Sequence, residues 1–504
     1  MLSEVIFKLL VNFIIFSSIT IFVWLVIKIF NHKNYWYSQK IPYIKGNLPV
    51  IGNMWSLITR QESFVTMYEK FYRTHPEQSM IGFYNFQKPC LLIRDPELIK
   101  IVMHTEFTSF DKNISSLDRK LDPLLSSNPF FTFGDEWKIH RKIMNNGLSN
   151  KRLKLIAQQI SNISKKFSNY LNDNIKDEIV VEAVDFFSSF TAEVTATCGF
   201  GIDGKSFDKK NSKNFKNVVK KLIEPNSTQV MSELIGLFFP VLRKLFQIKF
   251  IPHDIDGYFR EIIHDVIEAR KISPLIENDY LQQAIEFYNS ENEIVGHAAS
   301  FFLNGHLTSS FAIAFTVLQI ASHQKVQDKL RQEAKLVLQK HGGEMNYECL
   351  QELKYFDKVI NESIRLFPPL GFLGKVCTQE YNLTGSDGLH VCVKPGTDII
   401  ISVLGLHRDP HHWTNPNDFN PDRFNNEDKY HHKYSHLGFG AGSRICVGMR
   451  VAMLQIKASL ATLLIHCSLE IDSKTKIPVT VSPMSSLFTF TDGGIWIRIK
   501  ALKQ

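Results

Sequence analysis

The chain has 504 residues, of which 44% are hydrophobic and 12% aromatic, a composition that excludes an intrinsically disordered protein and is sufficient to enclose a cofactor. The net charge of +8 is modest and no basic block alternates with aromatic residues, so we expect no nucleic acid as a partner. The seven cysteines are scattered and form no C-x-x-C pair, which argues against a disulfide framework and a zinc site and favours a cytosolic location for most of the chain.

An apolar segment near the N-terminus is the first predicted element. Leu9 to Ile27 carries no charge and would form a helix about 28 Å long, close to the hydrocarbon thickness of a bilayer. A cleaved signal peptide is the alternative, but Lys28 and Lys33 follow the segment in place of a small-residue cleavage site. Because positive charges favour the cytosolic side, we predict a membrane anchor over residues 1–30 with the rest of the chain in the cytosol.

Residues 31–53 are predicted to form a stiff hinge between this anchor and a single domain over residues 54–504. Two prolines and two glycines between 41 and 53 disfavour both a helix and a central strand there. Strand-like runs occur at 81–93 and 396–403, and helical patterns predominate elsewhere. The sequence therefore predicts a mainly α fold with a small β region.

Two short motifs lie in the first half of the chain. Trp137 and Arg141 are four residues apart at the start of a predicted helix and therefore share a face. Residues 199–206 match the pattern G-x-x-x-x-G-K-S of phosphate-binding loops. Such a loop should follow a buried strand and open an apolar helix, but a polar segment follows Lys205 and a helical pattern precedes Gly199. We therefore interpret 199–206 as a turn after a helix.

The segment 231–250 is apolar and aromatic, contains Pro240, and includes the cations Arg243, Lys244 and Lys249. One interpretation is a pair of core helices. The other is a surface segment whose apolar side chains enter lipid while its cations meet the headgroups. We favour the second interpretation.

Residues 294–322 contain no proline and few charges, and they predict a central buried helix about 45 Å long. Within it, Gly305 weakens the helix and allows a ligand to approach, and Thr308 offers a hydroxyl to a backbone carbonyl. His306 precedes Thr308 by two positions, about 200° around the helix, so it is expected to face a neighbouring element.

The last motifs lie in the C-terminal third. Glu362 and Arg365 are three residues apart on one helix face, and the sequence PDRF at 421–424 follows. The segment FGAGSRICVG at 439–448 is a glycine-rich loop that precedes an apolar helical run. Its glycines allow close approach to a flat ligand. It places Cys446 beside Arg444 and at a helix N-terminus, both of which would stabilise a thiolate, and a soft thiolate suits iron.

The loop FGAGSRICVG keeps the spacing F-x-x-G-x-R-x-C-x-G of the cytochrome P-450 family. The W-x-x-x-R pair, the central-helix segment and the E-x-x-R pair precede it in the family's order, so the chain resembles this family from about residue 40 onward. The sequences at 95–97 (DPE), 122–125 (DPLL) and 407–410 (HRDP) most resemble those of insect microsomal members that oxidise lipophilic foreign compounds. The resemblance implies the cytochrome P-450 fold, preceded by one transmembrane helix, with residues 54–504 as the heme-thiolate catalytic domain.

The resemblance also implies roles for individual residues. Cys446 would bind the iron of heme b as a thiolate, Gly305 and Thr308 would be catalytic, and Arg423 would join Glu362 and Arg365 in a structural cluster. The other residues expected to contact the heme are Trp137, Arg141, Lys375, Phe439, Arg444 and Gly448. The substrate pocket would be formed by residues within 107–125, 301–308, 370–373 and 487–490.

Two positions of the central helix depart from the family pattern. Leu307 stands where the family has an acid that relays protons, and Asn304 where it has a small residue. We therefore expect turnover that loses more reduced oxygen as peroxide than in a member with the acid. Lys375 stands where the family usually has a propionate-binding arginine and would replace it as a point charge.

The implied activity is that of a heme-thiolate monooxygenase of the endoplasmic reticulum membrane, with the catalytic domain facing the cytosol. It would insert one oxygen atom from O2 into a lipophilic small molecule, using electrons from NADPH through a flavin reductase, with cytochrome b5 as a second candidate donor. The basic face for an acidic reductase would comprise Lys138, Arg141, Lys142, Lys433, Arg444 and Arg450. The alternatives are an isomerase or dehydratase that needs neither O2 nor a reductase, and non-enzymatic heme binding.

Overall fold

The computed structural model of this protein describes residues 16, 17, 19, 20, 35–115, 117–208, 215, 216, 235, 240–272, 279–425, 432–485 and 488–502. The predicted anchor over 1–30 lies outside the described residues, apart from four residues between 16 and 20 that are helical. Among the described residues, one helix, α14 (Glu291–Ser322), is long and apolar enough to cross a membrane, and 78% of its apolar window is buried inside the protein. This burial is typical of a core helix.

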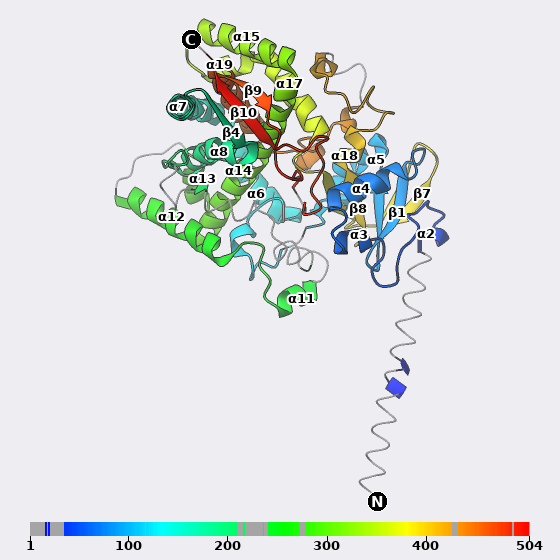
Figure 1. Ribbon diagram of the computed structural model, residues 1–504. Coiled ribbons are helices and arrows are strands. Elements are labelled where there is room, and N and C mark those ends of the chain that lie inside the picture. Colours follow the sequence, from blue (N-terminus) through cyan, green and yellow to red (C-terminus); the bar gives the residue numbers. More distant parts are fainter. Residues whose placement is uncertain are drawn as a thin grey trace, which may run out of the picture.

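Helices predominate, as the sequence predicts (Figure 1). The longer ones are α4 (Phe64–Arg73), α6 (Gly134–Gly147), α7 (Asn150–Asn174), α8 (Ala183–Phe200), α12 (His253–Ile272), α13 (Tyr280–Phe287), α14, α15 (Gln324–Lys340), α17 (Lys354–Leu366) and α19 (Met449–His466). The short ones are α2 (Tyr35–Ser38), α3 (Trp55–Ile58), α5 (Pro96–Lys100), α11 (Pro240–Leu245), α16 (Tyr347–Glu352) and α18 (Val403–His407). Tighter or wider single turns are η1 (Ile101–Thr105), η2 (Phe107–Ser109), η3 (Pro123–Leu125), η4 (Pro421–Asn425), η5 (Lys433–Ser435) and η6 (Gly442–Arg444).

The strands of the described residues form three small sheets. The five-stranded sheet has the order β1-β2-β8-β5-β3, from β1 (Met80–Asn85), β2 (Lys88–Ile93), β8 (Asp398–Ser402), β5 (Phe372–Val376) and β3 (Lys112–Asn113). The three-stranded sheet is β4 (Glu178–Glu182), β10 (Trp496–Ala501) and β9 (Cys467–Ile471), and β6 (Tyr381–Thr384) pairs with β7 (His390–Val393). Both predicted strand regions are confirmed: 81–93 is the hairpin β1–β2, and β2 lies parallel to β8.

Most of the long helices and the five-stranded sheet lie on different sides of the molecule. Figure 1 shows α7, α8, α13, α14, α15 and α19 gathered on one side, and α4, α5, β1 and β8 on the other. Helix α14 is central, since it packs against α8, α17, α19, α12 and α13. The N-terminal part of α14 joins one buried cluster and its C-terminal part another, and the sheet side has a third of its own. The predicted central buried helix is thereby confirmed.

The predicted hinge packs against the sheet from Trp36 onward. The Trp36 side chain is buried and its Nε1 donates to the carbonyl of Phe83 at 3.0 Å, while Ile44 N donates to the carbonyl of Gly82 at 2.9 Å. Residues 41–53 contain no helix, as predicted, but their path is not extended throughout, because Leu48 and Gly52 form an isolated antiparallel bridge across a turn. The boundary at residue 53 stays a prediction.

The G-x-x-x-x-G-K-S segment follows a helix, as the sequence analysis predicts. Helix α8 ends at Phe200, and Gly201 terminates it in the left-handed conformation with φ of 69°. The carboxylate of Glu193, within α8, accepts the backbone N–H of Ser206 at 3.1 Å. Since a protein carboxylate already occupies this N–H group, the segment is a structural turn after a helix.

Candidate functional site

The cysteine loop has the tight backbone that its glycines predict. Gly440 and Gly442 both have positive φ, at 70° and 65°, and a Cβ on Gly442 would collide with the backbone carbonyl of Met103. Cys446 N donates to the carbonyl of Phe439 at 2.8 Å, which closes the loop. Helix α19 begins at Met449, so Cys446 lies directly before a helix N-terminus, as predicted.

This loop and α19 form one wall of a cavity of about 310 Å³, and α14 and α8 form another. Cys446 is accessible from this cavity. Most of the remaining lining is apolar, including Phe130, Val194, Phe301, Leu370 and Leu373. An enclosed apolar cavity with few polar groups is typical of a site for a flat cofactor and a lipophilic ligand.

Three cations line the cavity, and none of the described lining residues is an aspartate or a glutamate. Arg444 donates to the carbonyls of Pro129 and Thr132, each at 2.7 Å, and its guanidinium lies 4.7 Å from the ring centre of Trp137. Lys375 is buried and donates to Asn113 Oδ1 at 2.9 Å. The cavity therefore has an excess of positive charge.

This charge fits a ligand that carries carboxylates. Burial and then the Arg444 charge lower the pKa of Lys375 far below its ordinary value, and burial lowers the pKa of Arg444 to about 10. Arg444 Nε and the hydroxyl of Thr132 are buried and have no hydrogen-bond partner among the described residues. Buried cations and unsatisfied donors are costly unless an anion is bound. The two propionates of a heme would supply such anions.

Two of the cysteines line the cavity, Cys446 and Cys198, and they differ in their surroundings. Burial raises the pKa of the Cys446 thiol, while backbone N–H groups of Gly448 and Met449 and the charge of Arg141 act to lower it. Burial, and to a smaller extent the charge of Asp279, raise the pKa of Cys198 to about 12. Cys446 is therefore the better candidate for a thiolate that binds a metal.

The cation that acts on the Cys446 sulfur is not the one that the sequence predicted. Arg444, which was expected to favour the thiolate, extends toward the carbonyls of Pro129 and Thr132. Arg141 acts on the sulfur instead, and its Nη2 donates to the carbonyl of Ile445 at 2.6 Å. Arg141 and Arg444 both line the cavity, so the expected outer basic face is reduced to the exposed residues Lys138, Lys142, Lys433 and Arg450.

Opposite the cysteine loop, α14 presents Gly305 and Thr308 to the cavity. Thr308 Oγ1 donates to the carbonyl of Asn304 at 2.6 Å, which confirms the predicted contact with a backbone carbonyl. The carbonyl of Gly305 accepts a side-chain donor from α19, Gln455 Nε2 at 3.2 Å. Two successive carbonyls of α14 thus receive side-chain donors at the point where the cavity meets the helix.

His306 and Leu307 lie on other faces of α14. His306 is buried and its Nδ1 hydrogen-bonds with Thr191 Oγ1 at 2.8 Å, which confirms that this ring faces a neighbouring helix. Burial lowers the pKa of His306 to about 3, so the ring is neutral at physiological pH. Leu307 is buried in an apolar cluster with Phe302 and does not line the cavity.

Glu362, Arg365 and Arg423 are brought together, as the resemblance implies. Both Glu362 oxygens accept from Arg365, at 2.7 and 2.9 Å, and Oε1 also accepts Arg423 Nε at 3.1 Å. Arg365 further donates to the carbonyls of His407 and Pro416, each at 2.7 Å. The cluster joins α17 to the segment that leads into η4, and none of its three residues lines the cavity.

The sequence predicted part of the cavity lining and missed part of it. Residues within 107–125, 301–308 and 370–373 do line it, but the described residues Phe488 to Phe490 do not, and Leu487 lies outside the described residues. Lining residues that the sequence analysis missed include Asn128, Phe130, Val194, Thr195, Cys198, Ser309 and Gln455. The spacing of Val194 and Cys198 on one face of α8 was the available signal, but it is equally typical of core packing.

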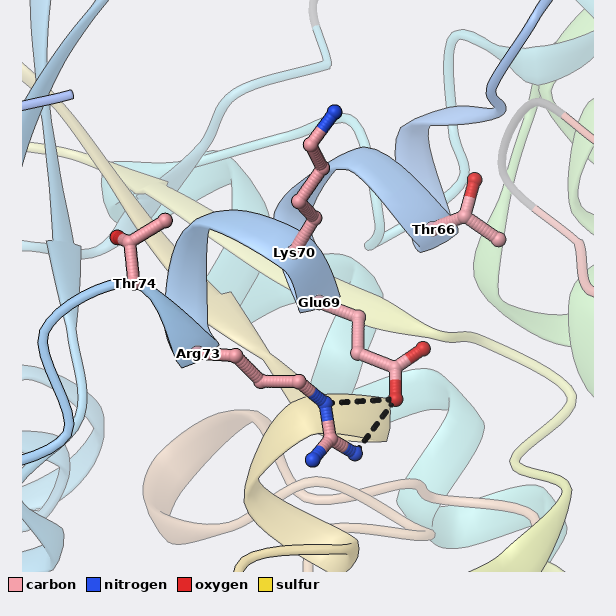
Figure 2. Close-up of a pocket in the computed structure, with 5 residues that line it drawn as sticks. All are labelled: Thr66, Glu69, Lys70, Arg73 and Thr74. Atoms are coloured by element: carbon pink, nitrogen blue, oxygen red, sulfur yellow. Dashed lines mark hydrogen bonds and ion pairs between the residues drawn. The ribbon is translucent and has the colours of Figure 1, made fainter. Parts of the chain in front are cut away.

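A second depression lies on the exposed face of α4. Figure 2 shows its five lining residues, which all come from this one segment of chain, with Arg73 paired to Glu69 at 2.9 Å. An ion pair between neighbouring turns of a helix is common on protein surfaces and contributes little. We assign no function to this depression.

Comparisons with known proteins agree with the geometry. Residues 42–496 match the family model described as Cytochrome P450. The chain is 29% identical over 458 residues to cytochrome P450 6l1 of Blattella germanica, covering 90% of each chain. It is 29% identical to cytochrome P450 9e2 of the same organism, covering 97% of each chain. It is 28% identical to cytochrome P450 6a9 of Drosophila melanogaster, covering 93% of this chain and 94% of that one.

Proposed function

This chain belongs to the cytochrome P450 family, and on that premise we propose that it is a membrane-bound monooxygenase of lipophilic small molecules in which Cys446 binds the heme iron. The family binds heme through a cysteine thiolate and its members are monooxygenases. The bound heme supplies the activation of dioxygen, and electron donation from the thiolate favours O–O cleavage.

One observation carries the assignment of the site. Cys446 opens into an apolar cavity that has three cations and no described carboxylate in its lining. A heme would complete this arrangement, because its iron needs one soft anionic ligand and its propionates need cations. We therefore assign propionate contacts to Arg444 and Lys375, with Arg141 next to the ligand loop, while Trp137, Phe439 and Gly448 line the cavity around them.

The remaining residues hold the substrate and manage protons. Apolar side chains of α8, α14 and β5 would exclude water and enclose a lipophilic molecule. Gly305 leaves space beside α14, and the Thr308 hydroxyl, which donates to the Asn304 carbonyl, can hold a water or pass a proton at that point. Leu307 is buried in an apolar cluster, so proton delivery would depend on Thr308 and water.

The membrane interpretation of 231–250 is supported by the described part of that segment. Helix α11 exposes Val241, Leu245 and, directly after it, Phe246, with 77%, 70% and 67% of their surfaces accessible. Figure 1 shows α11 protruding at one edge of the molecule. Exposed large apolar side chains that are grouped in this way favour contact with lipid. We place the protein at the endoplasmic reticulum membrane with its catalytic domain in the cytosol.

The thiolate assignment is tested by the absorption spectrum of the reduced protein with carbon monoxide. We expect the strongly red-shifted Soret band of thiolate-bound heme in the full chain and its loss in Cys446→Ala. Cys198→Ala serves as the matched control, since Cys198 also lines the cavity, and it should retain the band. A Cys446→Ala variant that retains the band would refute the assignment.

A reductase that accepts electrons from NADPH is the proposed partner, with cytochrome b5 as a second donor. The exposed cations Lys138, Lys142, Lys433 and Arg450 are candidates for its docking face. Docking that is steered by charge weakens as salt screens it, with a screening length of about 10 Å at 0.1 M salt. Lys142→Glu should therefore slow the first electron transfer at low salt and reduce its salt dependence, as measured by stopped-flow reduction. Lys335→Glu provides the control, because Lys335 is also an exposed cation but lies on α15, outside the candidate docking face.

A product assay with and without reductase addresses the isomerase or dehydratase alternative. A monooxygenase forms product only with NADPH, reductase and dioxygen. Product from a peroxide substrate without reductase, together with no product when all three are supplied, would support the alternative.

A further inference from the structure

Two asparagine side chains meet at the edge of the cavity, one from α14 and one from the loop between η3 and α6. Asn304 lines the cavity at the position where the family pattern has a small residue, and Asn128 lines it from the facing loop. Asn128 Nδ2 donates to Asn304 Oδ1 at 3.4 Å, and Asn304 Nδ2 donates to Asn128 Oδ1 at 3.5 Å. The two amides therefore form a reciprocal pair that connects segments 176 residues apart.

The orientation of the Asn128 amide is set by its own loop. Asn128 is buried, and its Oδ1 also accepts the backbone N–H of Phe130 at 2.9 Å. That contact fixes which end of the amide is oxygen, and the reciprocal pairing then fixes the Asn304 amide as well. Asn304 is consequently held with its Nδ2 beside Asn128 Oδ1.

The pair is weak and retains hydrogen-bonding capacity. Its distances of 3.4 and 3.5 Å are longer than the range of about 2.7–3.2 Å for strong N–H···O bonds. An amide offers two N–H donors and two lone pairs, and the reciprocal pair uses one donor and one lone pair of Asn304. Asn304 is exposed and lines the cavity, in contrast to the buried Asn128.

Several other hydrogen-bond donors of the lining are already engaged, although Gln455 Oε1, which is an acceptor and cannot bind a carbonyl oxygen, has no hydrogen-bond partner among the described residues. Thr195 Oγ1 donates to the carbonyl of Thr191 in its own helix at 2.8 Å, and Gln455 Nε2 donates to Ser309 Oγ at 2.6 Å. Lys375 donates to Asn113. A polar group with spare capacity in an otherwise apolar cavity determines which ligands bind and how they are oriented.

We propose that the Asn128–Asn304 pair is a specificity-determining subsite that selects lipophilic molecules carrying a carbonyl group. The carbonyl oxygen would accept a hydrogen bond from Asn304 Nδ2, while Asn128 keeps the amide in place. A carbonyl fits because it is an acceptor without a donor, so it leaves no proton unsatisfied in the apolar surroundings. This inference rests on the proposed function, since the heme spectrum is the means of detecting the ligand.

The test compares two probes of the same skeleton, 4-phenylbutan-2-one and butylbenzene, in the full-length heme-loaded protein. Their dissociation constants are measured from the shift of the heme Soret band on titration. Asn304→Leu removes the hydrogen bond and keeps the side-chain volume. Because one such bond contributes about 1 kcal/mol, the ratio of the two constants should move about fivefold against the ketone. Asn304→Ala should move the ratio in the same direction.

Thr195→Val is the matched control, since its hydroxyl lines the cavity but is bound within α8. This variant should leave the ratio unchanged. The proposal is overturned if the ratio is the same in the wild type and in both Asn304 variants. It is also overturned if the wild type binds neither probe, or if Thr195→Val shifts the ratio as much as the Asn304 variants do. The carbon monoxide band separates the subsite hypothesis from the proposed function. If every protein shows the band and the ratio is unchanged, only the subsite is refuted. If the wild type lacks the band, the proposed function is refuted.

Discussion

At the scale of single residues, the departure of α14 from the family pattern has a physical consequence. Leu307 is 5% exposed and lies in an apolar cluster, so the face of α14 that lacks the acid is surrounded by apolar side chains. An acid placed there would be buried among apolar side chains and would cost stability. A glutamate introduced at position 307 is therefore not expected to improve proton delivery, and Thr308 remains the candidate for this role on the cavity side.

Thr308→Val should increase the share of electrons lost as peroxide. The substitution keeps the side-chain shape but removes the hydroxyl that donates to Asn304 O at 2.6 Å. A lost hydrogen bond of about 1 kcal/mol corresponds to about a fivefold change in partitioning between product and peroxide. The measurement is product formed per NADPH consumed. Thr308→Ser should restore most of the wild-type ratio, and a Thr308→Val enzyme with unchanged coupling would exclude this role.

The sequence predicted some of these residues for clear reasons and could not predict others. The cysteine loop has a dense local pattern, and the course of its backbone follows from its glycines. The cation predicted to stabilise the Cys446 thiolate was wrong. Arg444 is close to Cys446 in sequence, but its side chain extends toward Pro129, and Arg141 acts on the sulfur instead. Local spacing specifies which residues are close along the chain but not the direction of a long side chain.

At the scale of elements, uninterrupted apolar segments were predicted well, and segments whose partners are distant in sequence were not. Helix α14 and the hairpin β1–β2 follow from apolar patterns. Arg243 was expected to meet lipid headgroups, but it is 3% exposed and paired with Asp122, 121 residues away. This buried pair anchors α11 to the segment before η3, and no property of residues 231–250 indicated it.

Helix α11 should enter lipid while Arg243 holds it to the domain. An environment-sensitive fluorophore attached at Phe246→Cys in the full chain should shift to shorter wavelength when the protein is reconstituted in vesicles that contain anionic lipid. Leu336→Cys is the control, because Leu336 is also exposed, at 59%, but lies on α15. Figure 1 shows α15 and α11 at opposite edges of the molecule. Equal spectra at both positions, after subtraction of labelling in the unsubstituted chain, would contradict the lipid contact.

At the scale of the whole molecule, long-range polar contacts hold together segments that the sequence places far apart. Arg365 connects α17 to the carbonyls of His407, Pro416 and Asp418, and Asn420 N donates to Glu362 Oε1 at 2.8 Å. These contacts fix the chain between α18 and η4. The sequence could suggest this cluster only by resemblance, because an E-x-x-R spacing by itself is common.

Glu362→Gln should destabilise the protein and reduce its heme content before it affects chemistry. The fully buried carboxylate pairs with both Arg365 and Arg423, so its removal leaves two buried guanidinium groups without a countercharge. Breaking a buried ion pair in this way costs about 3–5 kcal/mol. The measurements are the unfolding midpoint in denaturant and the heme bound per protein. Glu97→Gln, which breaks an exposed ion pair with Lys100, should change both by little.

The fraction of Glu362→Gln protein that retains heme distinguishes a structural role of the cluster from a role in the reaction. If Glu362 is structural, the fraction of Glu362→Gln protein that retains heme should show the wild-type product per NADPH, because none of the three cluster residues lines the cavity. The reverse pattern, full stability and heme content with impaired coupling, would mean that the cluster acts in the reaction. Arg423→Met distinguishes the two arginines: it removes one partner of Glu362 and leaves the two bonds from Arg365, so it should destabilise less than Glu362→Gln.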